Sequence, residues 1–170
     1  MPEPDILLSC AGGDLVLPAP GLALVDREDG GNLIVNPPRP VWERSALGAE
    51  ELAAWSFLVA AAGEAMLTAL PQLEGGCINY WEAGNWALNH DAAPPGPKTA
   101  PEHRRVHLHL LGRSRFARNP DWAWGEAPRF PAFADRHAWA AGNRRLTAAE
   151  CAAVTAAARA LLAGKYGLAA

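Results

Sequence analysis

The sequence predicts an α+β domain with an antiparallel sheet, one long helix and a C-terminal helix. Three observations lead to this fold class. Apolar residues recur at spacings of three and four between Gly48 and Leu70, which is the period of an amphipathic helix. Thr147-Ala148-Ala149-Glu150 has the form of a helix capping box. Polar and apolar side chains alternate from Arg105 to Leu111, as they do in a half-buried strand.

Length and composition are those of one folded domain. The chain has 170 residues, of which 50% are hydrophobic and 19% are charged. A chain of this length buries on the order of 70% of the surface of its unfolded form. We expect residues 1–170 to form a single domain, with a core over 22–113, an irregular covering segment over 114–145 and a C-terminal helix over 146–164.

Cysteine usage and the lack of targeting signals predict a cytoplasmic location. Cys10, Cys77 and Cys151 are far apart and show no CxxC spacing, so neither a zinc knuckle nor a disulfide framework is expected. The N-terminus has no basic stretch followed by a long apolar run. No stretch approaches the roughly 18 apolar residues of a membrane span, so we expect no membrane partner.

The charge distribution favours a small anionic ligand. The formal net charge is −3, whereas general nucleic-acid binders carry a strong positive excess, so no polymeric nucleic acid is expected. The segment from Glu102 to Arg118 nevertheless contains five arginines around His107 and His109, with a single acid. Such a cluster attracts anions, although a solvated basic face has the same composition.

The N-terminal part of the chain is expected to contribute strands. Two apolar runs, Leu22 to Asp26 and Asn32 to Asn36, flank a glycine-bearing turn and predict a hairpin. Ile6 to Cys10 and Leu15 to Leu17 are candidates for two shorter strands.

The middle of the chain is predicted to contain two further strands and a long loop. Cys77 to Trp81 and Arg105 to Leu111 have the composition of strands, and Gly112 is expected to end the second. The polar, proline-rich stretch from Gly84 to Pro101 is expected to be a loop, and loops of this length often line sites.

The tryptophans are read chiefly as packing residues. Trp55 and Met66 follow the apolar stripe of the long helix and are expected in the core. The covering segment is rich in Trp, Phe, Pro and Arg and shows no stable period. Within it, Trp122 and Trp124 are expected either to pack this segment on the domain or to close over a nucleobase by stacking.

The strand from Arg105 to Leu111 carries the residues that can do chemistry. Side chains two apart share a face, so Arg105, His107 and His109 are expected to point one way at intervals of roughly 7 Å, with the apolar residues facing the core. This row offers a nucleophile, a second imidazole for an oxygen and a fixed positive charge. Two histidines at this spacing also occur on plain surfaces and in metal sites. His103 is expected to be a loop residue beyond easy reach.

This segment resembles the signature of the histidine-triad (HIT) family of nucleotide hydrolases and transferases, which is His-x-His-x-His followed by two apolar residues. Arg105-Val106-His107-Leu108-His109-Leu110-Leu111 is similar to it, with Arg105 in place of the first histidine. The family's nucleoside-binding hairpin is resembled by Leu24-Val25-Asp26, Asn32-Leu33-Ile34-Val35 and Pro37-Pro38-Arg39. The resemblance covers about residues 22–113 and implies a HIT-like antiparallel sheet of about five strands.

The resemblance implies a role for each matching residue. His107 corresponds to the nucleophile that attacks an α-phosphorus and forms a nucleotidyl-histidine, which water then hydrolyses. His109 corresponds to the histidine that binds the phosphate oxygens. Asp26 corresponds to the carboxylate that receives the ribose hydroxyls, and Asn32, in the same hairpin, is a further candidate for substrate binding. The family also implies a homodimer, a small-molecule nucleotide as substrate, and no required cofactor or metal.

The chain departs from the family pattern at two places. Arg105 cannot act as an acceptor, so it would bind phosphate directly or lower the pKa of the neighbouring histidine. The loop before the histidine strand is also longer than in the family. Asn79, Asn85 and Lys98, which lie in this loop or in the strand before it, are candidates for polar contacts with substrate.

The residues and the resemblance together predict a hydrolase or nucleotidyl transferase acting on a nucleoside phosphate anhydride, ester or phosphoramidate, such as a diadenosine polyphosphate. Two alternatives stay open. One is a nucleotide-binding protein with little turnover, in which Arg105 has exchanged chemistry for phosphate affinity. The other is a metal-dependent hydrolase that uses His107 and His109 with a carboxylate such as Glu82.

Overall fold

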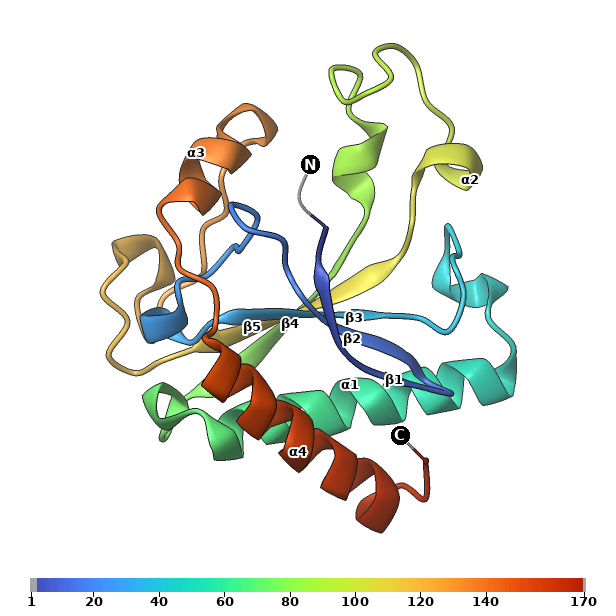
Figure 1. Cartoon of the computed structure of the whole chain (residues 1–170). Coiled ribbons are helices and arrows are strands. Elements are labelled where there is room, and N and C mark those ends of the chain that lie inside the picture. Colours follow the sequence, from blue (N-terminus) through green and yellow to red (C-terminus); the bar gives the residue numbers. More distant parts are fainter. Residues whose placement is uncertain (1–2, 170) are drawn as a thin grey trace.

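The computed structural model describes residues 3–169, and its centre is a five-stranded antiparallel sheet (Figure 1). Across the sheet the strands are ordered β1-β2-β3-β5-β4. Their bounds are Asp5–Cys10 for β1, Gly13–Leu17 for β2, Asn32–Asn36 for β3, Cys77–Ala83 for β4 and His107–Arg113 for β5. The predicted α+β class and the antiparallel pairing are confirmed.

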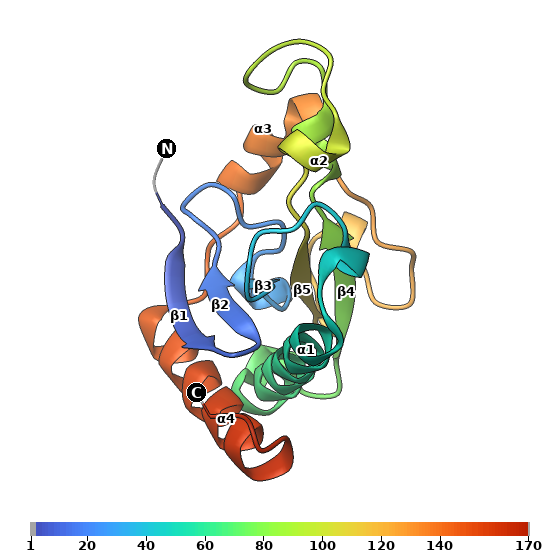
Figure 2. The same cartoon turned by 90° about the vertical axis from the view of Figure 1, so that its right-hand side faces the viewer.

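Two long helices lie on one side of this sheet, and two short ones lie on the other (Figures 1 and 2). α1 (Ala49–Ala69) and α4 (Ala148–Lys165) form where helices were predicted. The sequence did not predict α2 (Ala100–His103) or α3 (Arg136–Ala141), because each helix is too short to show a helical period of apolar residues. Short 3-10 turns lie at Arg27–Asp29, Arg44–Ala46, Pro71–Leu73, Asn85–Leu88, Pro120–Trp122 and Phe133–Asp135.

The main core lies between the sheet and the two long helices. Leu33 of β3 and Leu110 of β5 are fully buried there, and Trp55 and Met66 of α1 pack in the same cluster, as predicted. By length and composition alone, α1 is also apolar enough to cross a membrane. The prediction that no stretch of the sequence is long and apolar enough to span a membrane is therefore wrong for α1. Alanines between the larger side chains of α1 make the helix apolar over its whole length.

Residues 22–26 do not form the predicted hairpin strand. Both edges of β3 are already paired, with β2 on one side and β5 on the other, so no ladder position is left beside it. The backbone of the segment bonds to side chains instead. Leu24 N donates to Asn32 Oδ1 over 3.0 Å, and Trp139 Nε1 donates to Leu24 O over 2.9 Å. The hairpin is formed by β1 and β2, at the two shorter strand candidates.

Gly112 continues β5 rather than ending it. A Cβ atom at this position would lie 2.1 Å from Gly30 O. The glycine therefore permits a close approach of two backbones and does not mark a turn. Gly112 N also donates to Gly31 O over 2.9 Å. This contact ties β5 to the segment that precedes β3.

Glu150 joins the start of α4 to two other parts of the fold. It accepts a hydrogen bond from Thr147 N at 2.7 Å, which confirms the predicted capping box. It also pairs with Arg27 at 2.9 Å and accepts from Gln72 Nε2 at 3.0 Å. Burial raises the pKa of this carboxyl, but hydrogen bonds from Arg27, Thr147 and Gln72 outweigh it and lower the pKa to about 2.

We expect Glu150→Gln to destabilise the fold at neutral pH and much less in acid. A carboxyl with a folded-state pKa of about 2 stabilises the fold fully above its unfolded value near 4.5 and loses this contribution as pH falls through 2. Urea unfolding near neutral pH should show a loss on the order of 2–3 kcal/mol. Glu126→Gln, at an exposed position, is the control. An equal loss at neutral pH and near pH 2 would contradict this role.

Candidate active site

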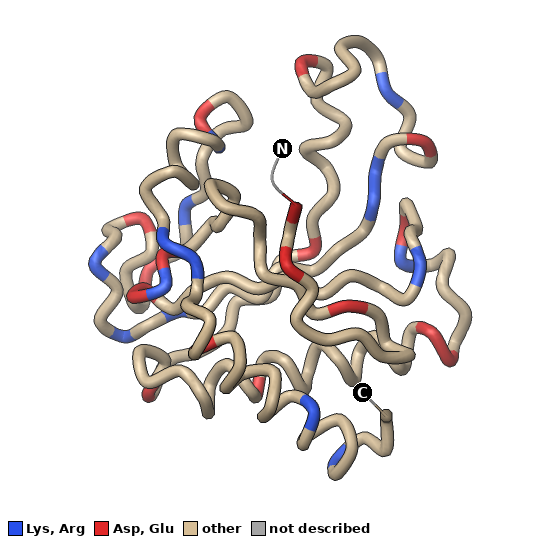
Figure 3. The backbone as a smooth tube through the Cα atoms, viewed as in Figure 1, with Lys and Arg blue, Asp and Glu red and all other residues tan. Residues whose placement is uncertain are grey.

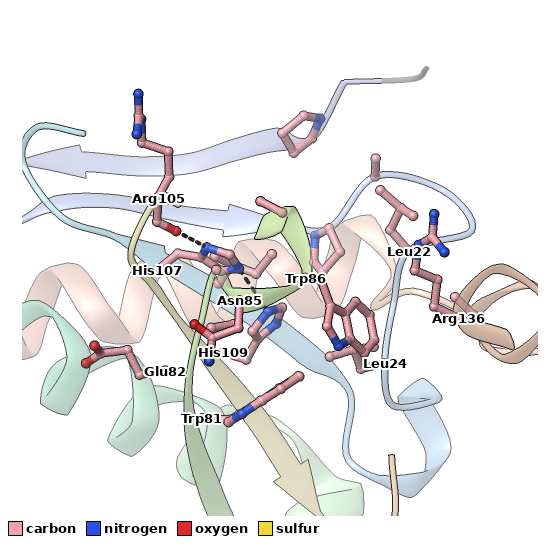
Figure 4. Close-up of a pocket in the computed structure, with 18 of the residues that line it drawn as sticks. Leu22, Leu24, Trp81, Glu82, Asn85, Trp86, Arg105, His107, His109 and Arg136 are labelled. Carbon is pink, nitrogen blue, oxygen red and sulfur yellow. Dashed lines mark hydrogen bonds between the residues drawn. The ribbon is translucent and has the colours of Figure 1, made fainter. Parts of the chain in front are cut away.

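A cavity of about 740 Å³ opens on the sheet face opposite α1 and α4 (Figure 4). Its floor is formed by β4 and β5 with one side chain of β3. Its walls are formed by the segment before β3, the loop after β4 and α3. The lining is mainly apolar with a few polar side chains, and the volume is in the usual range of small-molecule sites.

The register of the sheet places the histidine pair in this floor. His109 pairs with Ile34 of β3 on one side and with Trp81 of β4 on the other. The rings of His107 and His109 lie 4.9 Å apart. The leucines that alternate with them are buried in the core on the opposite face. The prediction that the two histidines share one face of the strand is confirmed.

The hydrogen-bond partners of the two imidazoles determine which ring nitrogen carries the proton. His107 Nδ1 lies 3.0 Å from Arg105 O. Because a carbonyl can only accept, Nδ1 carries the proton, and Nε2 of the neutral ring carries a lone pair that can accept a hydrogen bond. His107 Nε2 lies 3.1 Å from His109 Nε2, so a hydrogen bond between them requires His109 Nε2–H to donate. Neutral His107 thus presents a nucleophilic nitrogen, with an N–H donor beside it.

Burial favours the neutral form of both rings. It lowers the pKa of His107 below the ordinary 6.5, although the hydrogen bond to Arg105 O opposes this. Burial, together with the neighbouring His107, lowers the pKa of His109 to about 3. His109 is only 8% exposed, and its Nδ1 has no hydrogen-bond partner within residues 3–169. The pair is therefore uncharged at neutral pH.

Arg105 lies at the mouth of the cavity, where its backbone matters more to His107 than its side chain. The guanidinium is exposed and donates to Arg104 O at 2.8 Å and to Pro101 O at 3.2 Å. Figure 4 shows it turned away from the imidazoles while its carbonyl approaches His107. The contact that fixes the His107 proton is independent of the side chain at position 105, so an arginine here preserves it.

Aromatic rings line the cavity beside His109. The Trp81 ring stacks on His109 with centroids 5.4 Å apart and on Phe130 with centroids 4.7 Å apart. Trp86 meets Trp81 edge-on at 5.9 Å. The sequence did not single out either tryptophan as a site residue. The sequence does place Trp81 in a predicted strand. That strand indicates a site residue only when its register against the histidine strand is known, because the register sets Trp81 opposite His109.

Three further polar side chains border the cavity. Asn85, a predicted substrate contact, lies in the turn after β4. His103 was expected in a loop beyond reach, but it ends α2 and lines the cavity, with Nδ1 3.3 Å from Thr99 O. Arg136 lines the cavity from α3 and was not anticipated, because nothing in the sequence indicated that helix.

Asp26 does not line the cavity formed by the described residues. Its carboxylate accepts from Arg144 N at 2.7 Å and from the Arg144 guanidinium at 2.8 Å, and it caps the next turn by accepting from Glu28 N. Partial burial raises the pKa of Asp26, but these hydrogen bonds outweigh it and lower the pKa. A ribose contact by Asp26 stays a prediction that requires the Arg144 pair to open.

Asn32, Asn79 and Lys98, which were also predicted to contact substrate, lie outside the lining of the cavity in the described structure. Asn32 is 2% exposed and bonds to Leu24 N. Asn79 pairs with Leu111 within the sheet. Lys98 Nζ donates to three backbone carbonyls of its own loop. In this arrangement Asn32 and Lys98 hold backbone segments in place.

Lysines and arginines are spread over the molecule and interspersed with acids (Figure 3), and the five arginines expected around the histidine pair do not gather at the cavity of the described structure. Of the five, Arg105 is the one that lines the cavity in the described structure. Arg104 pairs with Glu43 at 2.7 Å, and Arg118 pairs with Glu28 at 3.0 Å. The remaining two lie over tryptophan rings. Four of the five guanidinium groups therefore interact with carboxylates or aromatic rings and not with the cavity.

Glu82 borders the cavity, but its carboxylate points away from the histidines (Figure 4). It accepts from Arg44 Nε at 2.8 Å and lies 3.7 Å from Arg104. Among residues 3–169, no group of three or more His, Cys, Asp or Glu side chains is arranged to hold a metal ion. Glu82 is therefore not grouped with the histidines as the metal-dependent alternative requires.

The two tryptophans of the covering segment differ in environment. Trp122 is 2% exposed, and its Nε1 donates to Gly112 O over 2.8 Å, so the interpretation as a packing residue is confirmed. Trp124 is 43% exposed, lies 5.9 Å from the Arg115 guanidinium and does not line the cavity of the described structure.

Neither a protein-family model nor a curated protein matches this chain. A function for the cavity is therefore inferred from its own residues and geometry.

We expect both histidines of the cavity to titrate below pH 6.5. Because burial disfavours the charged rings, the imidazole resonances of His107 should shift at a midpoint below 6.5, and those of His109 only near 3 or on acid unfolding. NMR titration, with single His→Gln variants to assign the resonances, measures both midpoints. A midpoint above 6.5 for either ring would show that it is charged at neutral pH and is not the neutral group described here.

Proposed function

We propose that this protein is a HIT-like nucleotide hydrolase or nucleotidyl transferase in which His107 is the nucleophile. The proposed substrates are nucleoside phosphate anhydrides, esters and phosphoramidates. The observation that carries the proposal is the neutral His107, held through Nδ1 by Arg105 O and in contact through Nε2 with His109, in the floor of an apolar cavity. The signature-like motif and the five-stranded antiparallel sheet support a HIT-like fold.

The first step is attack of His107 Nε2 on the α-phosphorus. A phosphorus–nitrogen bond forms, and the bond from phosphorus to the leaving group breaks, with its electron pair passing to the leaving group. The ring becomes a substituted imidazolium whose Nδ1–H is already bonded to Arg105 O. Because a hydrogen bond from a charged donor is stronger than one from a neutral donor, this carbonyl stabilises the nucleotidyl-histidine relative to the free ring.

His109 supplies a donor for the phosphoryl oxygen. Its Nε2 lies 3.1 Å from the attacking nitrogen, so an oxygen of the attacked phosphorus comes within reach of the same N–H. In the ligand-free site, burial and the neighbouring His107 lower the pKa of His109 to about 3, so His109 meets the substrate as a neutral donor. In the second step water attacks the phosphorus, and the phosphorus–nitrogen bond breaks with its electron pair returning to His107 Nε2. The attacking water loses a proton to solvent, and the nucleotide leaves with neutral His107 restored. Arg105, at the mouth, supplies a fixed positive charge for the remaining phosphates.

The binding alternative has one observation in its favour. Outside the buried pair, His103 and Glu82 are the side chains lining the described cavity that can pass a proton to a departing group, and the Glu82 carboxylate points away from the histidines (Figure 4). A poor supply of protons slows the departure of an alkoxide or amine far more than that of a phosphate. Substrates whose leaving group is a phosphate are therefore the first to test.

The expectations for location and assembly are retained as proposals. We propose a cytoplasmic homodimer that needs no cofactor or metal, as the HIT resemblance implies. The edge strand β4 exposes Tyr80, which is 52% exposed. An exposed aromatic residue on a sheet edge is compatible with a second copy joining there.

We expect His107→Ala to abolish turnover. Removing a nucleophile costs about a thousandfold or more in kcat, whereas His90→Ala, at an exposed loop position, should leave turnover unchanged. The measurement is product release from an adenosine polyphosphate and from an adenosine phosphoramidate, repeated with chelator and with added zinc or manganese. Rapid acid-free quenching and mass spectrometry should locate the nucleotidyl group on His107. Binding without turnover, or turnover that requires the metal, would favour one of the two alternatives.

We expect Arg105→Ala to keep most of the activity that His107→Ala loses. The carbonyl that fixes the His107 proton remains in this variant, so kcat should fall by no more than about tenfold, with the larger effect on KM for polyphosphates. Steady-state kinetics of both variants side by side tests this. A loss as large as that of His107→Ala would show that the guanidinium itself takes part in the chemistry.

A further inference from the structure

A continuous run of aromatic rings leads from the histidine pair to the far end of the cavity. The ring centroids of His109 and Trp81 lie 5.4 Å apart, those of Trp81 and Trp86 5.9 Å, and those of Trp86 and Phe133 6.4 Å. The guanidinium of Arg136 lies over Phe133 at 3.6 Å. Figure 4 shows His107 and Arg105 toward one end and Arg136 at the other, with Trp86 and Leu24 between them.

The cavity therefore has a reactive end, a flat apolar middle and a cationic far end. Trp86, Leu22 and Leu24 line the middle and offer a flat ring contact with little polarity. A substrate whose phosphate lies on the histidines would place its base among these side chains, because aromatic faces stack favourably on bases. The edge of that base would then meet Arg136.

Arg136 can only donate hydrogen bonds. Its Nη1 donates to Phe133 O, which leaves Nε and Nη2 for a ligand, and no carboxylate pairs with it in residues 3–169. The carbonyl of the wall residue Leu24 is already engaged, because it accepts from Trp139 Nε1 at 2.9 Å. Ala23 O, next to it in the chain, accepts from Asn143 Nδ2 at 2.9 Å. This end of the cavity thus presents donors to a base edge and few free acceptors.

From this arrangement we infer that the cavity selects nucleotides of 6-oxopurines, guanine and hypoxanthine, over those of adenine; the inference rests on the proposed function for placement of the phosphate. The O6 and N7 atoms of a 6-oxopurine are two adjacent acceptors that match the fork of an arginine. Adenine offers N7 beside an amino group, which is a donor facing a donor. The unmatched pair costs adenine one of the two hydrogen bonds to Arg136.

The test compares guanosine, inosine and adenosine 5′-diphosphates, whose leaving group is phosphate, as substrates of the intact protein. We expect kcat/KM for guanosine and inosine to exceed that for adenosine by about tenfold to a hundredfold, since a bidentate arginine discriminates bases by this amount. Inosine shares O6 and N7 with guanosine and lacks the 2-amino group. Equal turnover of guanosine and inosine therefore assigns the preference to the edge that Arg136 meets.

Arg136→Met should remove this preference. The variant keeps an apolar stem beside Phe133 and loses the donors, so KM for guanosine and inosine should rise to that for adenosine while kcat changes little. Arg129→Met is the matched control in the same segment, because Arg129 is 79% exposed and pairs with Asp121 at 3.6 Å. Circular dichroism of both variants confirms that the fold is kept.

Binding separates a failure of this inference from a failure of the proposed function. Quenching of tryptophan fluorescence by GMP, IMP and AMP measures base preference without chemistry, since Trp81 and Trp86 lie in the cavity. Tighter GMP and IMP binding without turnover would overturn the enzyme and keep the base preference. Equal or tighter AMP binding, a guanosine preference that inosine lacks, or an Arg136→Met effect equal for all three nucleotides would overturn the 6-oxopurine inference.

Discussion

The register of β5 between β3 and β4 is the constraint on which the site depends. Residues 108–111 of β5 pair with β3 on one side and with β4 on the other, so a slip by one position would disturb two ladders and exchange the faces of every side chain. In the observed register Leu108 and Leu110 are buried under the helices, and His107 and His109 face the cavity on the opposite side. The apolar core thus aims the imidazoles, because the same alternation that buries the leucines exposes the histidines to a ligand.

Within this frame, the proton arrangement of the pair needs no charged partner. A backbone carbonyl fixes Nδ1–H of His107, and burial holds both rings neutral. A carboxylate in the same place would raise the pKa of the ring and favour the imidazolium, which has no lone pair to attack phosphorus. An arginine at position 105 leaves this proton arrangement unchanged, because its carbonyl makes the hydrogen bond to His107 and its side chain turns outward.

Much of the fold could be predicted from the sequence, and the site only in part. The long helices and the histidine strand have periods that local physics dictates, and the shared face of His107 and His109 follows from that period. The prediction of a strand over 22–26 is wrong because apolar composition suits a strand, whereas pairing depends on whether an edge of β3 is free. Trp86 and Arg136 have no local signal, because contacts between distant segments bring them to the cavity.

The covering segment decides which polar groups reach the ligand. Its Arg144 binds the carboxylate of Asp26 in a turn outside the cavity, and its Arg136 enters the lining instead. Both arginines follow from the docking of one stretch of chain, through Trp139 and Asn143, onto the backbone of residues 23 and 24. The same docking thus occupies a carboxylate suited to sugar hydroxyls and supplies a donor suited to a base edge. In the function we propose, recognition at the far end is accordingly weighted toward the base.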